Sequence, residues 1–174
     1  MKATALLEKQ HRKVEGIFEK LEAGKGAAAP LLEELANDLA AHMTIEQEIF
    51  YPAIQAVEPD MVAESYEEHA LAELALKRLL ATSPDSEQFK ARVVALKELI
   101  QHHVEEEEGD LFPKVEKQVE TEQLTKLGKQ MKARFDEVFE AGFEAAVPSG
   151  FEQTSADASL RLTGIGAIGA ALPM

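Results

Sequence analysis

Two copies of one histidine–glutamate pattern restrict the fold of this chain more than any other feature of its sequence. One copy runs from His42 to Pro52 and the other from His103 to Pro113. In both copies a glutamate follows the histidine at the fourth position and the proline follows it at the tenth, so the copies match in register. Residues four apart lie on one face of an α-helix. The repeat therefore predicts two helices that each direct an imidazole and a carboxylate toward one point.

The other histidines extend this repeat. His11 with Glu15 and His69 with Glu73 form a second matched pair, and the two kinds of unit alternate along the chain. His102 misses the register by one residue, so we expect it at the surface or beside the site. A single histidine most often only satisfies a hydrogen bond, but four in register favour a metal site. Imidazole and carboxylate together suit iron, manganese or zinc, and helical bundles can hold two such ions.

The composition limits the chemistry of this site. The chain has 174 residues, enough for one domain with its own core, and no cysteine. Thiolate-bound zinc, iron–sulfur clusters and disulfides are thereby excluded. The net charge of −14 opposes binding to nucleic acid or to anionic membrane surfaces. The sequence has no apolar run long enough to span a membrane and no secretory signal at its start, so we expect a cytoplasmic protein.

Apolar residues at three- and four-residue spacing predict an all-α fold. Pro52 is expected to bend or stop the second helix, and the fourth is expected to be interrupted at Gly109. Short connections between the first four helices favour an antiparallel four-helix bundle. The apolar stripe of the fifth helix packs either on this bundle or against a second copy of the chain in a homodimer. The expected helices cover residues 4–22, 30–51, 61–81, 87–108 and 120–146.

The pattern resembles the hemerythrin-like, HHE cation-binding family. In that family a histidine, an HxxxE motif followed by Phe-Pro, another histidine and a second HxxxE with Phe-Pro lie on four successive helices, and the resemblance covers roughly residues 5–115. It implies a four-helix bundle with two iron ions joined by an oxo or hydroxo bridge, although zinc or manganese would accept the same ligand types. Carried over by position, the ligands are six residues, with the glutamates as bridges: His11, His42, Glu46, His69, His103 and Glu107.

The departures from this family bear on function. Glu15 and Glu73 lie one turn after their histidines and are either additional ligands or charged residues at the edge of the site. Oxygen-carrying hemerythrins have a histidine at the position of Glu73, so this chain differs from the carriers. Fewer imidazoles favour ferric iron and leave coordination positions for dioxygen or peroxide. Tyr51 and Tyr66 are either hydrogen-bond donors beside the site or core aromatics.

The resemblance therefore implies a protein that binds or processes dioxygen, peroxide or nitric oxide, in oxygen and iron handling or in protection from oxidative stress. Catalase-, peroxidase- and ferroxidase-like turnover are the enzymatic forms of this function. The alternative is an iron store or an iron or oxygen sensor without turnover.

We expect three parts along the chain: the bundle over residues 1–118, an additional amphipathic helix over 119–147 and a tail rich in Gly, Ala and Ser over 148–174. The tail segment from Leu162 to Gly166 loosely resembles the short peptides that direct hemerythrin-like cargo into encapsulin shells. An encapsulin shell is thus one expected partner, and a disordered or self-packing tail is the alternative.

Overall fold

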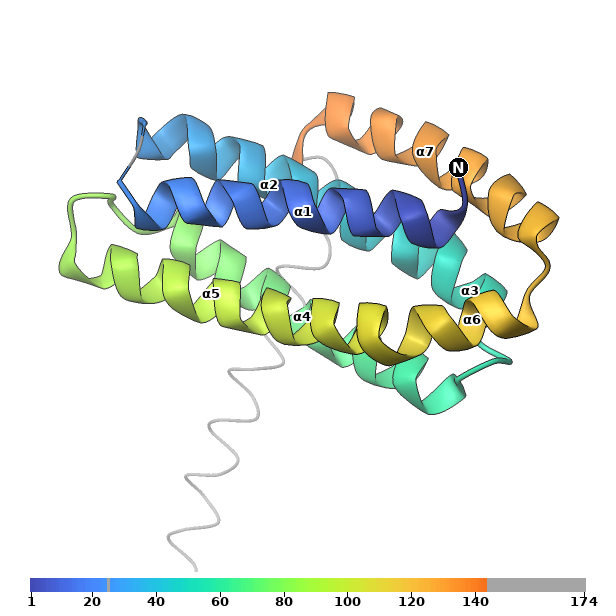
Figure 1. Ribbon diagram of the computed structural model, residues 1–174. Helices are drawn as coiled ribbons and strands as arrows, with labels where there is room; N and C mark the ends of the chain where they lie inside the picture. The colour runs from blue at the N-terminus through green and yellow to red at the C-terminus, as the bar shows by residue number, and fades with distance from the viewer. Residues whose placement is uncertain (25, 144–174) are drawn as a thin grey trace, which may run out of the picture.

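A computed structural model describes residues 1–24 and 26–143 of the chain (Figure 1). Within these residues the secondary structure is helical, with no strands. Two short segments, η1 and η2, are π-helical turns that join an α-helix to its continuation. The elements in order are α1 (Ala3–Glu22), α2 (Ala28–Ile45), η1 (Glu46–Phe50), α3 (Tyr51–Ile54), α4 (Pro59–Leu80), α5 (Glu87–Glu106), η2 (Glu107–Leu111), α6 (Phe112–Gln118) and α7 (Thr121–Ala141).

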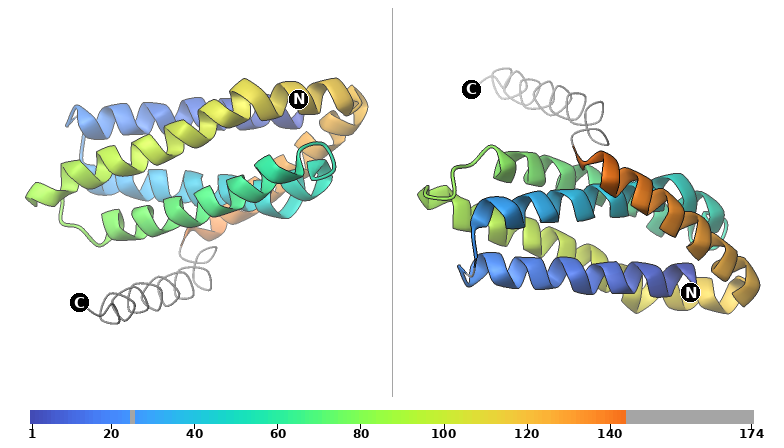
Figure 2. Two further views of the ribbon diagram at one scale, coloured as in Figure 1. Left: turned by 90° about the horizontal axis from the view of Figure 1, so that it is seen from below. Right: turned by 90° about the horizontal axis from the view of Figure 1, so that it is seen from above.

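Helices α1, α2, α4 and α5 form an antiparallel four-helix bundle, and α7 lies along one side of it (Figures 1 and 2). In the bundle α1 contacts α2 and α5, and α4 contacts α2 and α5, while α7 contacts α1 and α2. The predicted all-α bundle with an added helix is thereby confirmed. None of the helices in the described part of the chain is long and apolar enough to cross a membrane.

The fifth predicted helix, α7, packs on the bundle through its apolar stripe. Leu124, Met131 and Val138 on this stripe are buried. Gly128 lies so close to the start of the chain that an added Cβ would come within 2.9 Å of the carbonyl carbon of Lys2. The helix ends at Ala141, earlier than the predicted residue 146, because the chain turns at Gly142 with a φ of 81°. A homodimer stays a prediction, and the predicted tail lies outside the described residues.

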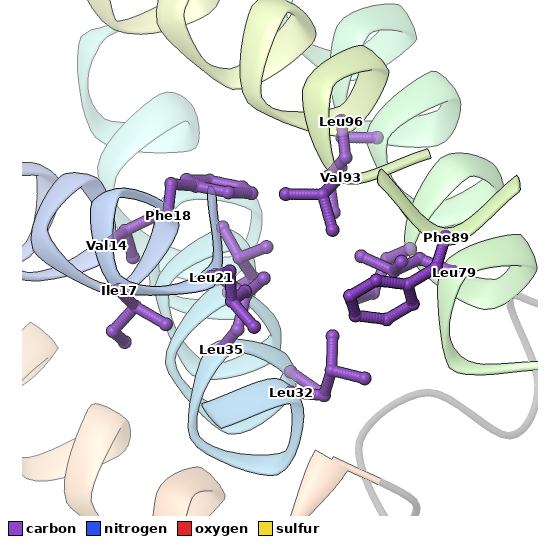
Figure 3. Packing of buried hydrophobic residues seen from close by; sticks show 14 of the residues in the cluster. Val14, Ile17, Phe18, Leu21, Leu32, Leu35, Leu79, Phe89, Val93 and Leu96 are labelled. Atoms are coloured by element: carbon purple, nitrogen blue, oxygen red, sulfur yellow. The ribbon is translucent and has the colours of Figure 1, made fainter. Parts of the chain in front are cut away.

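Two apolar clusters fill the bundle. One gathers residues of α1, α2, α4 and α5, such as Phe18, Leu35 and Leu79, at the end of the bundle where α1 leads into α2 (Figure 3). The other includes Leu7, Phe50, Tyr51 and Phe112 and joins the start of α1 to η1, η2 and α7. Along each of the four helices the buried histidine lies between residues of the two clusters. Rigid apolar packing therefore surrounds the polar residues on both sides.

Gly109 lies in η2, the π-helical turn that interrupts the fourth α-helix as predicted, whereas Pro52 does not stop the second helix. After each π-helical turn the segment continues as an α-helix, α3 to Ile54 and α6 to Gln118. Each proline lacks the N–H that would bond to a carbonyl four residues earlier. A π-helical turn before it absorbs one extra residue, so the proline begins a new helical segment, where no N–H is needed. In η1 this widening leads the N–H of Tyr51 to donate to the carbonyl of Glu46, five residues back.

Candidate metal centre

Four buried imidazoles meet in the middle of the bundle. His11 lies on α1, His42 on α2, His69 on α4 and His103 on α5, and each is at most 5% exposed. They form two pairs. The Nε2 atoms of His11 and His42 are 3.2 Å apart, and so are the Nε2 atoms of His69 and His103. All four imidazoles thus direct the same nitrogen into the bundle.

Two glutamates connect the histidine pairs. Glu46 Oε2 lies 3.2 Å from the Nε2 of His42 and 3.3 Å from that of His69. Glu107 Oε2 has the same relation to the other two histidines, at 3.4 Å from the Nε2 on α1 and 3.7 Å from that on α5. Each carboxylate therefore contacts one histidine of each pair, and the six side chains form a closed ring. This ring has the twofold symmetry of the sequence repeat.

The six residues predicted from the family resemblance are thus brought together by the fold, and their binding of metal stays a prediction. The donor atoms of His11, His42, Glu46 and Glu107 all lie within 4.8 Å of one another. Those of Glu46, His69 and His103 also do. The two groups share Glu46, so the arrangement can accommodate two neighbouring cations with a carboxylate between them.

The pKa values of two of the four histidines favour cation binding. Burial, reinforced by the other three histidines, lowers the pKa of His42 well below its usual range, and burial lowers the pKa of His69 to about 3. These imidazoles are therefore neutral at neutral pH, the form in which they bind metals. Burial, together with the charge of Glu107, raises the pKa of Glu46 well above its usual range. A bound cation would offset this shift by stabilising the carboxylate.

The unpaired oxygens of the glutamates support the same interpretation. Both carboxylate oxygens of Glu46 and the Oε2 of Glu107 are buried without a hydrogen-bond donor. Leaving a buried charged group without a partner is costly, so such atoms are expected to bind a cation. Two donors that are each about 2.1 Å from a tetrahedral ion lie about 3.4 Å apart. The contacts of 3.2–3.7 Å around the ring fit this spacing, so the residues present suit bound metal.

The outer nitrogen of each imidazole is held by a side chain that the sequence analysis missed. The Nδ1 of His11 contacts Glu108 Oε1 at 2.7 Å, and the Nδ1 of His103 contacts Glu68 Oε2 at 2.7 Å. The Nδ1 atoms of the other two histidines contact the side-chain amides of Gln10, at 2.8 Å, and Gln47, at 3.0 Å. Such contacts fix the tautomer and orientation of metal-binding histidines.

A signal for these four residues is present in the sequence. Gln10 and Glu68 directly precede the histidines of α1 and α4, and Gln47 and Glu108 directly follow the two ring glutamates. Because the positions match in both halves of the repeat, the register that identified the ligands also identifies their partners. The halves differ in charge, since the first half supplies two amides and the second half supplies two carboxylates.

Tyr51 is a further side chain that contacts the ring. It is fully buried, and its hydroxyl donates to Glu107 Oε1 at 3.0 Å. The same hydroxyl lies 3.3 Å from the Nε2 of His69 and 3.5 Å from that of His103. Burial, with the charges of the two ring glutamates, raises the pKa of Tyr51 well above its usual range. The phenol therefore keeps its proton directly beside the donor atoms.

The remaining candidates lie outside the ring. Glu15 pairs with the exposed Arg12, and Glu73 is half-buried without belonging to either group of donors. Tyr66 donates to the backbone carbonyl of Gln47 instead of entering the site. His102 is largely exposed and contacts other carboxylates on the surface.

A small, mostly apolar cavity of about 20 Å³ adjoins the four histidines. Its lining includes Val14, Leu39, Ala72 and Val104. A wider cleft of about 170 Å³ lies between α1 and α5, and it shares His11 and Val104 with the inner cavity. The site therefore adjoins a space that fits a molecule of a few atoms.

Comparisons with known proteins agree with this geometry. Residues 2–115 match the family described as Hemerythrin HHE cation binding domain. A crystal structure of a hemerythrin HHE cation binding domain-containing protein from Mycobacterium kansasii superposes with a TM-score of 0.72 at 23% identity, covering 88% of this chain and 96% of that one. A DNA nickase from Nostoc sp. is 29% identical over 127 residues, which are 71% of this chain and 36% of the nickase. The chain thus spans about a third of the length of that curated relative.

Proposed function

Because this chain belongs to the hemerythrin HHE cation-binding family, we propose that it holds two iron ions and uses them to bind or process dioxygen, peroxide or nitric oxide. The observation that carries the proposal is the closed ring of four imidazoles and two buried, unpaired carboxylates. Nitrogen and oxygen donors in this ratio suit iron, and a carboxylate between two donor groups suits a pair of ions.

The six ring residues would bind the two ions in different roles. His11 and His42 would hold one ion and His69 and His103 the other, while Glu46 and the second ring glutamate would bridge them. Two iron ions, when bound, supply redox-active Lewis acids that exchange electrons with a small ligand. The side chains on the outer nitrogens would keep each imidazole in a fixed orientation.

The surroundings of the ring favour a small uncharged ligand. The adjoining cavity of about 20 Å³ is lined mainly by apolar side chains, so it suits dioxygen, nitric oxide or hydrogen peroxide better than an anion. Tyr51 does not line this cavity, but its hydroxyl keeps a proton beside the ring, where it donates to Glu107 Oε1. A proton donor beside the atoms that would hold the metal supports processing as well as simple binding.

We do not extend DNA nicking to this chain. The name of the Nostoc relative describes a protein of which only about a third corresponds to this chain. With a net charge of −14, the chain would repel a phosphate backbone. We propose that its ligand is a small molecule and that nucleic acid is not its partner.

Metal content and absorption of the purified protein test this function. We expect two irons per chain and near-ultraviolet and visible absorption that changes when hydrogen peroxide, dioxygen or nitric oxide is added. The variant Glu46→Gln should lose most of the iron, while Glu73→Gln should retain it, because Glu73 lies outside the ring. The proposal would be contradicted if the purified protein contained zinc in place of iron, or if it retained no metal after anaerobic loading with ferrous iron. Retained iron without any turnover would instead favour the store or sensor.

A further inference from the structure

A second group of metal-type ligands lies at the surface of the bundle, next to the buried ring. It consists of Glu68 on α4 and of His102 and Glu106 on α5. His102 Nε2 lies 3.7 Å from Glu68 Oε1 and 3.5 Å from Glu106 Oε1. One donor atom from each residue lies within 4.8 Å of the other two. We propose that these three residues form a divalent cation site that receives metal before it enters the buried centre.

The geometry suits a cation better than it suits hydrogen bonds. Contacts of 3.5 and 3.7 Å are too long for good hydrogen bonds from the imidazole. They are close to the separation of about 3.4 Å expected for two donors on one tetrahedral ion. His102 and Glu106 are four residues apart on one helix, so both side chains face the same point. The His102 side chain is 63% exposed, which leaves the remaining coordination positions to water.

Glu68 connects this outer site to the buried ring. Its Oε1 faces His102, whereas its Oε2 contacts the Nδ1 of His103 at 2.7 Å. The Nε2 of His103 in turn faces the buried ring. One carboxylate and one imidazole therefore separate the two sites. A cation held outside by Glu68 would lie beside a ligand of the inner centre, which is the arrangement that transfer from one site to the other requires.

The sequence repeat supplies an internal comparison. The positions that correspond to Glu68, His102 and Glu106 in the first half of the chain are Gln10, Ala41 and Ile45. Both halves build the same pair of helices and supply the same three residues to the ring. The fold therefore does not require ligand-type residues at these positions, and the outer site is a property of the second half alone.

The outer site itself does not depend on the proposed function, whereas its role in loading rests on it. To test the site, full-length protein is loaded with Zn²⁺, gel-filtered to remove weakly bound ions and titrated with Zn²⁺ in equilibrium dialysis. We expect one additional, weaker zinc per chain beyond the retained zinc. The variants His102→Ala and Glu106→Gln should lose this additional zinc. Glu105→Gln is the matched control, because it removes an exposed charge from the same turn but contributes no donor.

To test loading, metal-free protein is mixed with Zn²⁺ and the rate at which zinc becomes resistant to EDTA is measured. His102→Ala and Glu106→Gln should slow this rate several-fold without changing the final amount of resistant zinc. An absent additional zinc in the unmodified protein would overturn the outer site. Additional zinc with unchanged rates in the two variants would overturn the loading role. If no zinc becomes resistant in any protein, the buried centre fails as a metal site, and the dialysis still decides whether the outer site exists.

Discussion

At the scale of single residues, Tyr51 distinguishes the two halves of the candidate metal centre. The repeat places Phe112 at the corresponding position, and Phe112 stacks on His11 with ring centres 6.1 Å apart. The Tyr51 ring lies 5.5 Å from that of His69, with the two ring planes tilted by 41°. Both aromatics pack against a ring histidine, so packing alone does not require the hydroxyl. We infer that the hydroxyl serves the chemistry of the site.

The variant Tyr51→Phe tests this inference. Without its hydroxyl, Glu107 Oε1 loses its donor, and we expect the metal-free protein to lose about 1–3 kcal/mol of unfolding free energy in urea. Metal content should remain, whereas the reaction with hydrogen peroxide, followed by absorption, should slow. Tyr66→Phe is the control, because that hydroxyl is partly exposed and donates to a backbone carbonyl outside the ring. Equal effects of the two variants on the peroxide reaction would count against a role for Tyr51.

At the scale of helices, the attachment of α7 depends on one close approach. An added Cβ at Gly128 would lie 2.9 Å from the carbonyl carbon of Lys2 and 3.0 Å from the nitrogen of Ala3, both backbone atoms that cannot rotate away. We expect Gly128→Ala to destabilise the protein by about 1–3 kcal/mol through overpacking, measured by urea unfolding. Metal content should not change, because α7 supplies none of the donors.

Gly16 on α1 provides the matched control. A Cβ at that position would meet no atom within 4 Å. Gly16→Ala should therefore stabilise the protein by up to about 1 kcal/mol, the gain in helix propensity. A stabilising Gly128→Ala would show that the start of the chain does not pack on α7 in solution.

The π-helical turns explain what the sequence could and could not predict at this scale. Helical periodicity located the five long helices, because their apolar residues follow the spacing of an α-helix. The resemblance to the family selected the six ring residues, since Glu15 and Glu73 have the same spacing from their histidines but lie outside the ring. It could not locate η1 and η2, since one extra residue in a turn leaves no sign in a pattern read at constant period. The shift of register caused by η1 decides where Tyr51 points. The sequence therefore could not decide whether the Tyr51 hydroxyl contacts the ring.

For the whole molecule, the buried charges connect the stability of the bundle to the proposed metal. Without a cation the core contains two glutamates with unpaired oxygens, between apolar clusters on either side. Burial raises the pKa of Glu46, so its ionisation opposes folding. The stability of the metal-free protein should therefore fall as the pH rises through this raised pKa. Bound metal removes this cost and adds its own binding free energy.

The variant Glu46→Gln should consequently have opposite effects in the two states. In the metal-free protein it replaces a buried carboxylate by a neutral amide, and the melting temperature near neutral pH should rise or stay unchanged. With metal present the variant should melt lower than the unmodified protein, because it has lost a bridging ligand. Thermal unfolding of both proteins, with EDTA and with excess metal, measures these opposite effects on the melting temperature directly. If Glu46→Gln lowered the melting temperature equally in both conditions, the carboxylate would stabilise the fold without metal, and the ring would be a structural hydrogen-bond network instead of a metal centre.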